Sequence, residues 1–453
     1  MLIHDITTIE KDVSTNISAN EVHKTLNKWM LVDGFDIVLD TTKSHGLWIV
    51  NEKNGDEYLD FFSFFASSPI GLNHPKLFDK EFREQLETAA RIKPSNSDIY
   101  SVEMAKFVDT FARVAKPSYM KHLFFIDGGA LAVENALKAA FDWKVRKNFQ
   151  KGYKEEKGQI VIHFKEAFHG RSGYTMSLTN TDPAKINYYP KFNWPRISNP
   201  KIKLPLSDNL KYIKKVEEDA VNQIYEAIKM YPDEIAALII EPIQCEGGDN
   251  FFRKEFLQKL RDITLDKDIM YIFDEVQTGI GMTGKMWAYQ HYAEPDMIAF
   301  GKKVQICGFM SSNRIDEVED NVFHKSSRIN STWGGNLADM VRSRRILEII
   351  EEDDLVNNSK KQGNYLLGQL RSLEMDFPNV ISQSRGLGLL ASFNLPSRHA
   401  RKAFLNKLYE NKLIMLGCGD TSVRFRPSLT VTKEEIDLAI EIIRKSLGEL
   451  NLI

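Results

Sequence analysis

An aspartate and a lysine follow two successive apolar segments of this chain. Asp274 comes directly after residues 270–273, and Lys303 lies just beyond residues 297–300. A lysine amine can hold an aldehyde as a Schiff base, and a buried aspartate can keep a ring nitrogen protonated so that the ring accepts electrons. The two residue types together therefore predict pyridoxal phosphate chemistry. Taken singly, Asp274 could cap a helix and Lys303 could be a solvated side chain.

Small residues open a helical segment after Asp127. Gly129 and Ala130 precede the amphipathic stretch 133–140, so a phosphate could approach bare N–H groups at the positive end of a helix dipole. Two glycines before a helix can also be a simple turn.

Two further loops follow apolar segments. In the first, Phe168 could stack on a flat ligand and Arg171 could fork onto a carboxylate, although a core aromatic and a solvated arginine would look the same. In the second, Glu241 and Glu246 could face one pocket, or belong to a glycine-rich surface loop.

The middle of the chain alternates short apolar runs with long amphipathic stretches, which predicts an α/β fold with a parallel sheet. We expect strands at residues 159–164, 235–240, 269–273 and 297–300, and a helix at about 208–231. In such sheets ligands bind beyond the carboxyl ends of the strands, where all of these loops lie. The proline-rich segment 183–205 is expected to be a long surface loop.

Both ends of the chain predict a smaller unit. Residues 47–50 and 57–61 indicate a hairpin turning at Asn54-Gly55, and the last helix is expected to begin with a capping box of Thr432 and Glu435. We expect residues 1–75 and 341–453 to form a small domain and residues 76–340 a large one.

Composition narrows the function classes. Lysine plus arginine number 60 against 62 acidic residues, a net charge of −2, so the chain has no basic field for nucleic acid or an anionic membrane. Small-molecule partners fit better. No apolar run is long enough to span a bilayer, residues 1–11 lack a leader-like apolar core, and a cytosolic location is expected. The three cysteines favour reduced thiols over a disulfide framework or a metal cage.

The order of the motifs carries a resemblance. Gly-Gly-Ala at a helix start, Phe-His-Gly-Arg, Glu-Pro-Ile-Gln, Asp-Glu-Val-Gln-Thr-Gly and Phe-Gly-Lys-Lys succeed one another over nearly the whole chain. In this order they resemble the class III pyridoxal phosphate-dependent aminotransferases. The resemblance implies fold type I, with a mainly parallel seven-stranded sheet in the large domain and a small α+β domain built from both chain ends.

The same resemblance assigns roles to individual residues. Lys303 would bind the cofactor aldehyde and move the proton, because the family's lysine stands five residues before the second glycine of a Gly-Gly pair. Counting back from Gly308 selects Lys303, with Lys302 as the competitor, but Cys307 replaces the first glycine of the pair.

The other implied cofactor contacts come from four parts of the chain. Asp274 would meet the ring nitrogen, Phe168 and Val276 the two ring faces, Gln277 the ring hydroxyl, and Gly129 and Ala130 the phosphate. Thr332 would reach the phosphate of a neighbouring subunit, which implies a homodimer with active sites at the interface.

The resemblance is closest to members that act on the ε-amino group of L-lysine with 2-oxoglutarate as acceptor. Arg171 would then hold the distal carboxylate of both substrates, near Gln277. Arg424 would bind the carboxylate beside the keto carbon of 2-oxoglutarate, and Glu246 would neutralise Arg424 while lysine reacts. The product, 2-aminoadipate 6-semialdehyde, is expected to cyclise to a piperideine carboxylate.

Three alternatives stay open. Ornithine or 4-aminobutyrate could be the donor, since the same pair of charges would serve any ω-amine. A racemase or aminomutase could use the same cofactor site without 2-oxoglutarate. A non-catalytic α/β binding protein would leave the ordered motifs unexplained.

Overall fold

The computed structural model describes residues 17–92 and 98–450. Residues 1–11, which we expected to lack a leader-like apolar core, lie outside the described residues. Within the described ranges, none of the helices combines the length and the apolar composition that a membrane span needs. The three cysteines are free thiols, as predicted.

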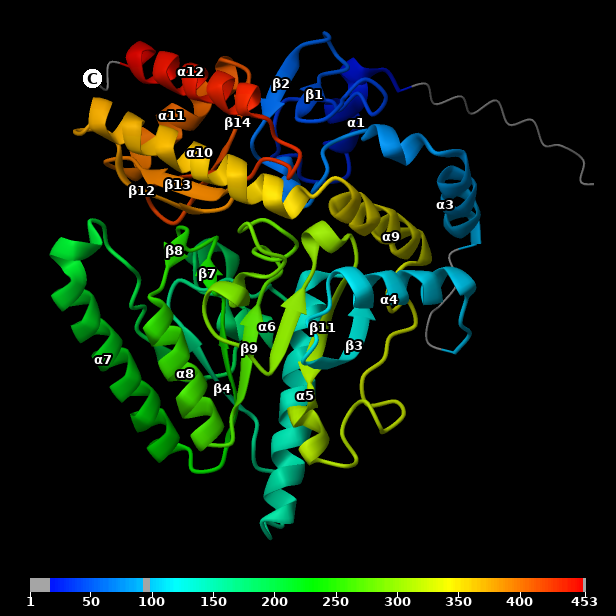
Figure 1. The fold of residues 1–453 in the computed structure, drawn as a ribbon, viewed down its shortest axis with the longest axis vertical. Helices are drawn as coiled ribbons and strands as arrows, with labels where there is room; N and C mark the ends of the chain where they lie inside the picture. The colour runs from blue at the N-terminus through cyan, green and yellow to red at the C-terminus, as the bar shows by residue number, and fades with distance from the viewer. Residues whose placement is uncertain (1–16, 93–97, 451–453) are drawn as a thin grey trace, which may run out of the picture.

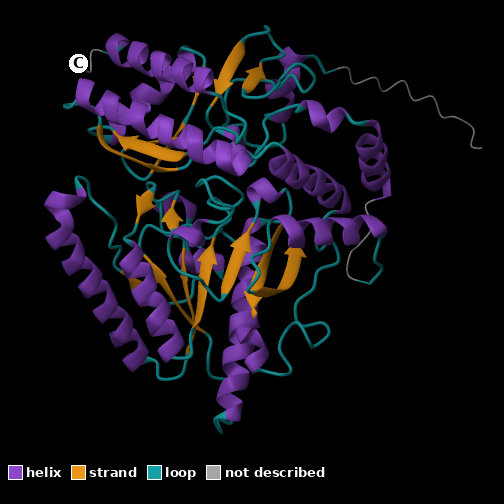
Figure 2. Ribbon diagram, viewed as in Figure 1, coloured by secondary structure: helices purple, strands orange, loops and turns teal. Residues whose placement is uncertain are grey.

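A seven-stranded sheet forms the centre of the large domain (Figures 1 and 2). Its strands are β3 (Met120–Ile126), β4 (Ile160–Phe164), β5 (Arg196–Ile197), β6 (Ile235–Ile240), β9 (Met270–Asp274), β10 (Met297–Phe300) and β11 (Cys307–Ser312). Their order is β3-β11-β10-β9-β6-β4-β5, and only β11 runs against its neighbours. The predicted mainly parallel seven-stranded sheet is confirmed, as are the four predicted strands.

The expectation of a long surface loop over residues 183–205 is wrong in two places. Arg196–Ile197 pairs with β4 and forms the edge strand β5, while Pro183–Lys185 makes the 3-10 turn η3. A two-residue edge strand among prolines has no alternating pattern to reveal it.

Helices cover both faces of the sheet, which explains why its central strands are apolar throughout. They are α4 (Val102–Val114), α5 (Gly129–Gln150), α7 (Leu206–Met230) and α8 (Lys254–Asp266). Helix α5 packs on one face with Ala237, Ile239 and Ile272, whereas α4, α7 and α8 pack on the other with Leu238 and Ile240. The expected helix at about 208–231 is α7.

The small domain combines the two ends of the chain. Strands β1 (Trp48–Val50) and β2 (Glu57–Asp60) form the predicted hairpin, and β14 (Leu413–Ile414) from the C-terminal part joins β2 in parallel. A four-stranded sheet contains β12 (Ser382–Leu387), β13 (Leu390–Asn394), β16 (Ser422–Phe425) and β15 (Leu416–Cys418). The remaining short strands, β7 (Ile243–Gln244) and β8 (Asn250–Phe251), form a ribbon. Figure 1 shows this domain lying above the carboxyl ends of the large sheet.

The helices of this half are α9 (Leu337–Glu352), α10 (Leu355–Asp376), α11 (Arg398–Glu410) and α12 (Lys433–Glu449), and the N-terminal part adds α1 (Val22–Leu26), α2 (Ser63–Ala66) and α3 (Lys80–Ile92). The short α6 (Thr175–Leu178) lies in the large domain. The predicted capping box of Thr432 and Glu435 opens α12. The domain limits at residues 75 and 340 stay a prediction.

Candidate active site

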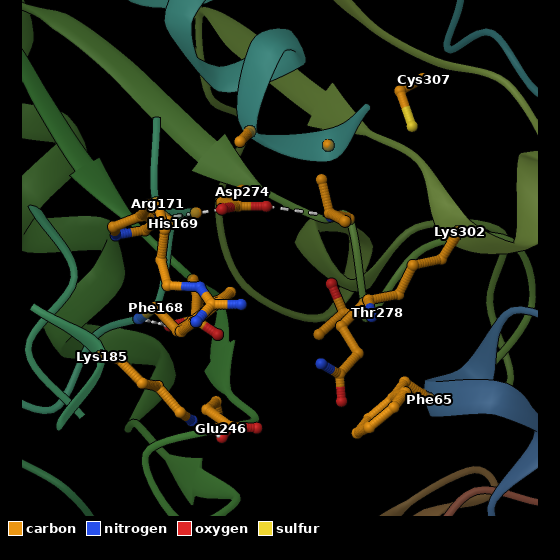
Figure 3. Close-up of a pocket in the computed structure, with 16 residues that line it drawn as sticks. Phe65, Phe168, His169, Arg171, Lys185, Glu246, Asp274, Thr278, Lys302 and Cys307 are labelled. Carbon is orange, nitrogen blue, oxygen red and sulfur yellow. Dashed lines mark hydrogen bonds and ion pairs between the residues drawn. The ribbon is translucent and has the colours of Figure 1, made fainter. Parts of the chain in front are cut away.

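A cavity of about 550 Å³ lies at the carboxyl ends of the sheet strands, below the small domain (Figure 3). It is lined by Phe65, Gly129, Ala130, Phe168, His169, Gly170, Arg171, Lys185, Glu241, Glu246, Asp274, Val276, Gln277, Thr278, Lys302 and Cys307. Segments far apart in sequence therefore meet here because parallel strands bring their carboxyl ends to one edge.

Asp274 is held by two hydrogen bonds at the end of β9. One carboxylate oxygen lies 2.8 Å from Nδ1 of His169, and the other accepts the Val276 amide at 3.1 Å. The His169 side chain is completely buried, and its Nε2 atom has no hydrogen-bond partner among the described residues. The fixed carboxylate faces the cavity, where a protonated ring nitrogen would complete its coordination.

The start of α5 is packed so closely that only small residues fit. Gly128 has a φ of +98°, and a Cβ atom on Gly129 would lie 3.1 Å from Val276. A Cβ atom on Gly170 would lie 2.5 Å from the Cβ of Ala130. The first N–H groups of this 22-residue helix therefore open into the cavity, as a phosphate site requires.

The two adjacent lysines point in different directions. Lys302 lines the cavity (Figure 3). The Lys303 ammonium is buried and donates at 2.7 Å to the main-chain oxygen of Gln277, a residue of the cavity lining, with the oxygen of Ala66 at 3.5 Å. Burial, and next the charge of Lys302, lower the pKa of Lys303 to about 7. Burial and next the charge of Arg424 also lower the pKa of Lys302.

The backbone after β10 explains this orientation. Lys302 has a φ of +49°, a strained conformation for a residue other than glycine. Gly301 allows the close approach, since a Cβ atom there would lie 2.7 Å from the Cys307 sulfur. Gln305 donates its amide to the Lys302 oxygen at 2.8 Å and its side-chain nitrogen to the Ser67 oxygen at 2.6 Å. The turn η5 (Lys302–Val304) is thereby held in place.

Two charged side chains of the opposite wall, Glu246 and Lys185, form an ion-pair group with Arg424 behind them. Glu246 places one carboxylate oxygen 2.5 Å from the Lys185 ammonium and the other 3.2 Å from Nη1 of Arg424. Burial alone would raise the pKa of Glu246, but the charges of Arg424 and Lys185 outweigh it and the pKa is lowered. Arg424 is buried and is not part of the cavity lining, so Glu246 separates it from the cavity.

A left-handed turn carries the aromatic cover of Arg424. The four residues of α2 all have positive φ, between +41° and +62°, which costs about 1–2 kcal/mol for each non-glycine residue. Asp60 stabilises the turn by accepting the amides of Phe62 and Ser63 at 2.8 and 2.7 Å. The turn places the Phe65 ring 5.7 Å from the Lys302 nitrogen and 5.9 Å from the Arg424 guanidinium carbon.

The buried carboxylate of Glu241 joins the loop of Phe168 to the loop that carries Cys245 and Glu246. Glu241 accepts the amides of Phe168 at 2.9 Å and Cys245 at 3.1 Å, and its burial raises its pKa well above the usual range. Phe168 is thereby held beside the cavity. Arg171 is exposed, and it has no ion-pair partner among the described residues, so its guanidinium is free to bind a carboxylate.

The remaining predicted residues divide between this cavity and the surface. Val276 and Gln277 line the cavity with Thr278. Glu275 anchors this loop by accepting the amides of Ala288 and Tyr289 at 2.6 and 2.8 Å, and burial raises its pKa to about 7. Thr332 is exposed and does not line the cavity of its own subunit.

No role for His169, Phe65 or Lys185 was predicted from the sequence. His169 stands inside the motif that drew attention to Phe168 and Arg171, so that loop carried a signal for it. Neither Phe65 nor Lys185 lies beside a recognisable motif, and only the fold brings them to the cavity.

The model of the family described as aminotransferase class III matches residues 32–447. The chain belongs to the class III aminotransferases. It is therefore a pyridoxal phosphate-dependent transaminase, as the resemblance of its motifs implied, and fold type I is confirmed.

Individual relatives are similar over almost their full length. The chain is 51% identical over 430 residues to the L-lysine-epsilon aminotransferase of Mycobacterium tuberculosis, covering 94% of this chain and 95% of the relative. Identity to the L-lysine-epsilon aminotransferase of Streptomyces clavuligerus is 48% over 435 residues, covering 95% of each chain. A solved structure of lysine aminotransferase from M. tuberculosis, in the internal aldimine form, superposes with a TM-score of 0.94 at 50% identity, covering 96% of this chain and all of that one.

The residues of the cavity fit the cofactor of this family. The open helix start suits a phosphate, the Asp274 carboxylate suits a ring cation, and the Lys303 amine lies against Gln277 of the lining. The closely packed glycine positions leave the space that side chains would otherwise fill.

Proposed function

We propose that this transaminase transfers the ε-amino group of L-lysine to 2-oxoglutarate, giving 2-aminoadipate 6-semialdehyde, which cyclises to a piperideine carboxylate, and L-glutamate. The observation that carries the proposal is the pairing of Glu246 with Arg424 at 3.2 Å behind the cavity wall. The names of the two relatives at 48–51% identity support the choice of lysine as donor.

The pairing suits an amine end without a carboxylate. When the ε-carbon of lysine reacts, the group beside it carries no negative charge, and a bare arginine there would be a buried unpaired cation. Glu246 neutralises that arginine. The exposed Arg171 then takes the distant α-carboxylate by a bidentate pair.

The keto acid requires the opposite arrangement. 2-Oxoglutarate has a carboxylate next to its keto carbon, and this carboxylate needs Arg424. Glu246 must therefore turn away during that half of the cycle. Its main-chain oxygen stays bound to the Gly419 amide at 2.9 Å, so the side chain can rotate while the backbone remains fixed.

Pyridoxal phosphate, when bound, supplies an aldehyde that accepts the amino group and a ring that stores the electrons of the cleaved bond. Asp274 holds the proton of the ring nitrogen, and His169 keeps the carboxylate in position. Gly129 and Ala130 donate main-chain N–H groups to the phosphate, Phe168 and Val276 confine the ring, and Gln277 binds its hydroxyl.

We infer that Lys303 is the lysine that binds the cofactor and moves the proton at the reacting carbon. It stands five residues before Gly308, the spacing that the resemblance of the motifs implies, and its buried ammonium lies 2.7 Å from the main-chain oxygen of Gln277 in the cavity lining. Burial, and next the charge of Lys302, lower the pKa of Lys303 to about 7, which favours the neutral amine, and only a neutral amine can take up a proton.

We further propose a homodimer in which Thr332 of each subunit serves the phosphate of the other. Its exposure on the surface, outside the cavity of its own chain, is consistent with this role. Sedimentation velocity tests the dimer, and a Thr332→Ala variant should bind the cofactor more weakly.

The proposed donor and acceptor can be tested separately. L-lysine is added to the purified holoenzyme without any keto acid while the absorption of the cofactor is followed, and 2-oxoglutarate is added afterwards. We expect lysine to change the absorption and 2-oxoglutarate to restore it. Ornithine and 4-aminobutyrate are compared in the same way. If the cofactor absorption changed faster with either amine than with L-lysine, that amine would be the donor. Turnover that needs no 2-oxoglutarate would indicate a racemase or aminomutase.

A further inference from the structure

Lys185 forms a charge pair that the aminotransferase cycle described above does not use. It is the last residue of η3, and its ammonium points to Glu246 across the cavity wall (Figure 3). The Lys185 nitrogen lies 2.5 Å from one oxygen of Glu246, while the other oxygen faces Arg424. Glu246 is thus shared between two cations.

The two contacts of Glu246 are unequal. The bond to Lys185 has hydrogen-bond geometry at 2.5 Å, whereas Nη1 of Arg424, 3.2 Å away, has no hydrogen-bond partner of suitable geometry among the described residues. Arg424 is therefore held by charge attraction and keeps a donor to offer. A ligand carboxylate could take that donor without displacing the stronger bond.

Turning Glu246 away from Arg424 raises an energetic problem. The Glu246 side chain is only 24% exposed, and a carboxylate that lost its cation at this depth would be strongly destabilised. Lys185 already holds the oxygen that does not face Arg424. The Glu246 side chain could therefore turn away from Arg424 while its carboxylate stays paired with the Lys185 ammonium.

Phe168 and the turn η3 hold the Lys185 side chain beside Glu246. Its nitrogen lies 5.5 Å from the centre of the Phe168 ring, and the Phe168 amide is fixed by Glu241. Asp182 caps η3 by accepting the Ala184 amide at 3.0 Å. The ammonium therefore approaches Glu246 from a supported turn, on the side away from Arg424.

We propose that Lys185 is the second ion-pair partner of the Glu246 carboxylate. It keeps that carboxylate paired when Arg424 binds the 1-carboxylate of an α-keto dicarboxylic acid. Lys185 is then a positioning residue that determines how readily the enzyme changes from its amine to its keto-acid substrate. This inference rests on the proposed function, because it assumes that one cavity serves both substrates.

The experiment measures the two half-reactions separately in the holoenzyme by rapid mixing. The variants are Lys185→Met, which removes the charge at similar length, and Lys185→Arg, which restores it. We expect Lys185→Met to raise the apparent KM for 2-oxoglutarate about tenfold, since a charged hydrogen bond is lost, and to leave kcat/KM for L-lysine nearly unchanged. Lys185→Arg should recover most of the difference.

A second readout is independent of turnover. Glutarate, a dicarboxylate without a keto group, is titrated into each holoenzyme by calorimetry, and its binding should weaken in Lys185→Met. Lys191 supplies a matched control, because its ammonium binds the oxygens of Ile186 and Tyr189 in the same loop without touching Glu246. Lys191→Met should leave the ratio of the two half-reactions unchanged.

A double variant tests whether Lys185 acts on 2-oxoglutarate through Glu246. In a Glu246→Gln background no carboxylate remains to be held, so adding Lys185→Met should change neither half-reaction further. Equal losses in both half-reactions of Lys185→Met would overturn the proposal, since Lys185 would then contact a group common to both substrates. Unchanged kinetics and unchanged glutarate binding would overturn it as well. Failure of the unaltered enzyme to react with L-lysine would instead reject the proposed function.

Discussion

The two walls of the cavity are built on different principles. On the sheet side each functional group has its own fixed partner: His169 holds Asp274, and the main-chain oxygen of Gln277 holds Lys303. On the side of the small domain one carboxylate, Glu246, is shared by two cations. The first wall suits a cofactor that stays bound, and the second suits substrates that exchange.

A fixed wall and an adjustable wall serve different ligands. A bound ring requires the same contacts in every half-reaction, so single, buried hydrogen bonds position it best. Two substrates with different charges require a wall that can change its charge pattern, and a shared carboxylate does this by rotating one side chain.

The largest expected effect separates the adjacent lysines of the rigid wall. Lys303→Ala should lower transamination by at least about 10³-fold, because it removes the amine that moves the proton. Lys302→Met should retain more of the turnover, since its amine is not the one that we infer to bind the cofactor. Steady-state rates and the cofactor spectrum of both variants check this. The reverse result would make Lys302 the cofactor lysine.

Asp274→Asn should lower kcat by about 10²-fold, because a neutral amide holds the ring proton poorly while filling the same space. His169→Gln serves as the comparison, and we expect a smaller loss because the carboxylate itself remains. Both are measured as single turnovers with L-lysine. A loss in Asp274→Asn no greater than in His169→Gln would mean that Asp274 does not hold the ring proton.

The shared wall should respond in one half-reaction only. Glu246→Gln leaves Arg424 unneutralised, so we expect kcat/KM for L-lysine to fall about tenfold while the 2-oxoglutarate half-reaction stays as fast. Rapid mixing of each substrate with the holoenzyme measures both. Equal losses would show that Glu246 does not distinguish the two substrates.

The smallest effect on catalysis concerns the turn that carries Phe65. Burial raises the pKa of Asp60 from 3.8 to about 6, so the folded state favours the protonated acid. The contribution of Asp60 to the free energy of unfolding is therefore largest below the unfolded pKa. It falls by about 3 kcal/mol as the pH rises from about 4 to 6. Asp60→Asn should lack this pH-dependent contribution, because an amide does not titrate.

Chemical denaturation of the wild type and Asp60→Asn between pH 4 and 7 checks the sign. The difference between their free energies of unfolding should change in favour of the variant as the pH rises. A constant difference over this range would mean that Asp60 does not titrate with a raised pKa.

Local patterns were sufficient for much of the fold. The strands β4, β6, β9 and β10 are short apolar runs, because strands covered on both faces need no polar side. The capping box of α12 and the β1–β2 hairpin also follow from neighbouring residues. The two-residue strand β5 could not be predicted in this way, since its only support is its pairing with β4.

The order of motifs and strands was enough to predict which loops meet at the cavity, because every motif follows a strand and parallel strands end at one edge. The different directions of the two adjacent lysines appear only in the folded chain. They depend on a left-handed backbone at Lys302 and on a hydrogen bond from Gln305 to Ser67, 238 positions away. The sharing of Glu246 between Lys185 and Arg424 likewise joins residues 61 and 178 positions away from it, and no local pattern encodes such distances.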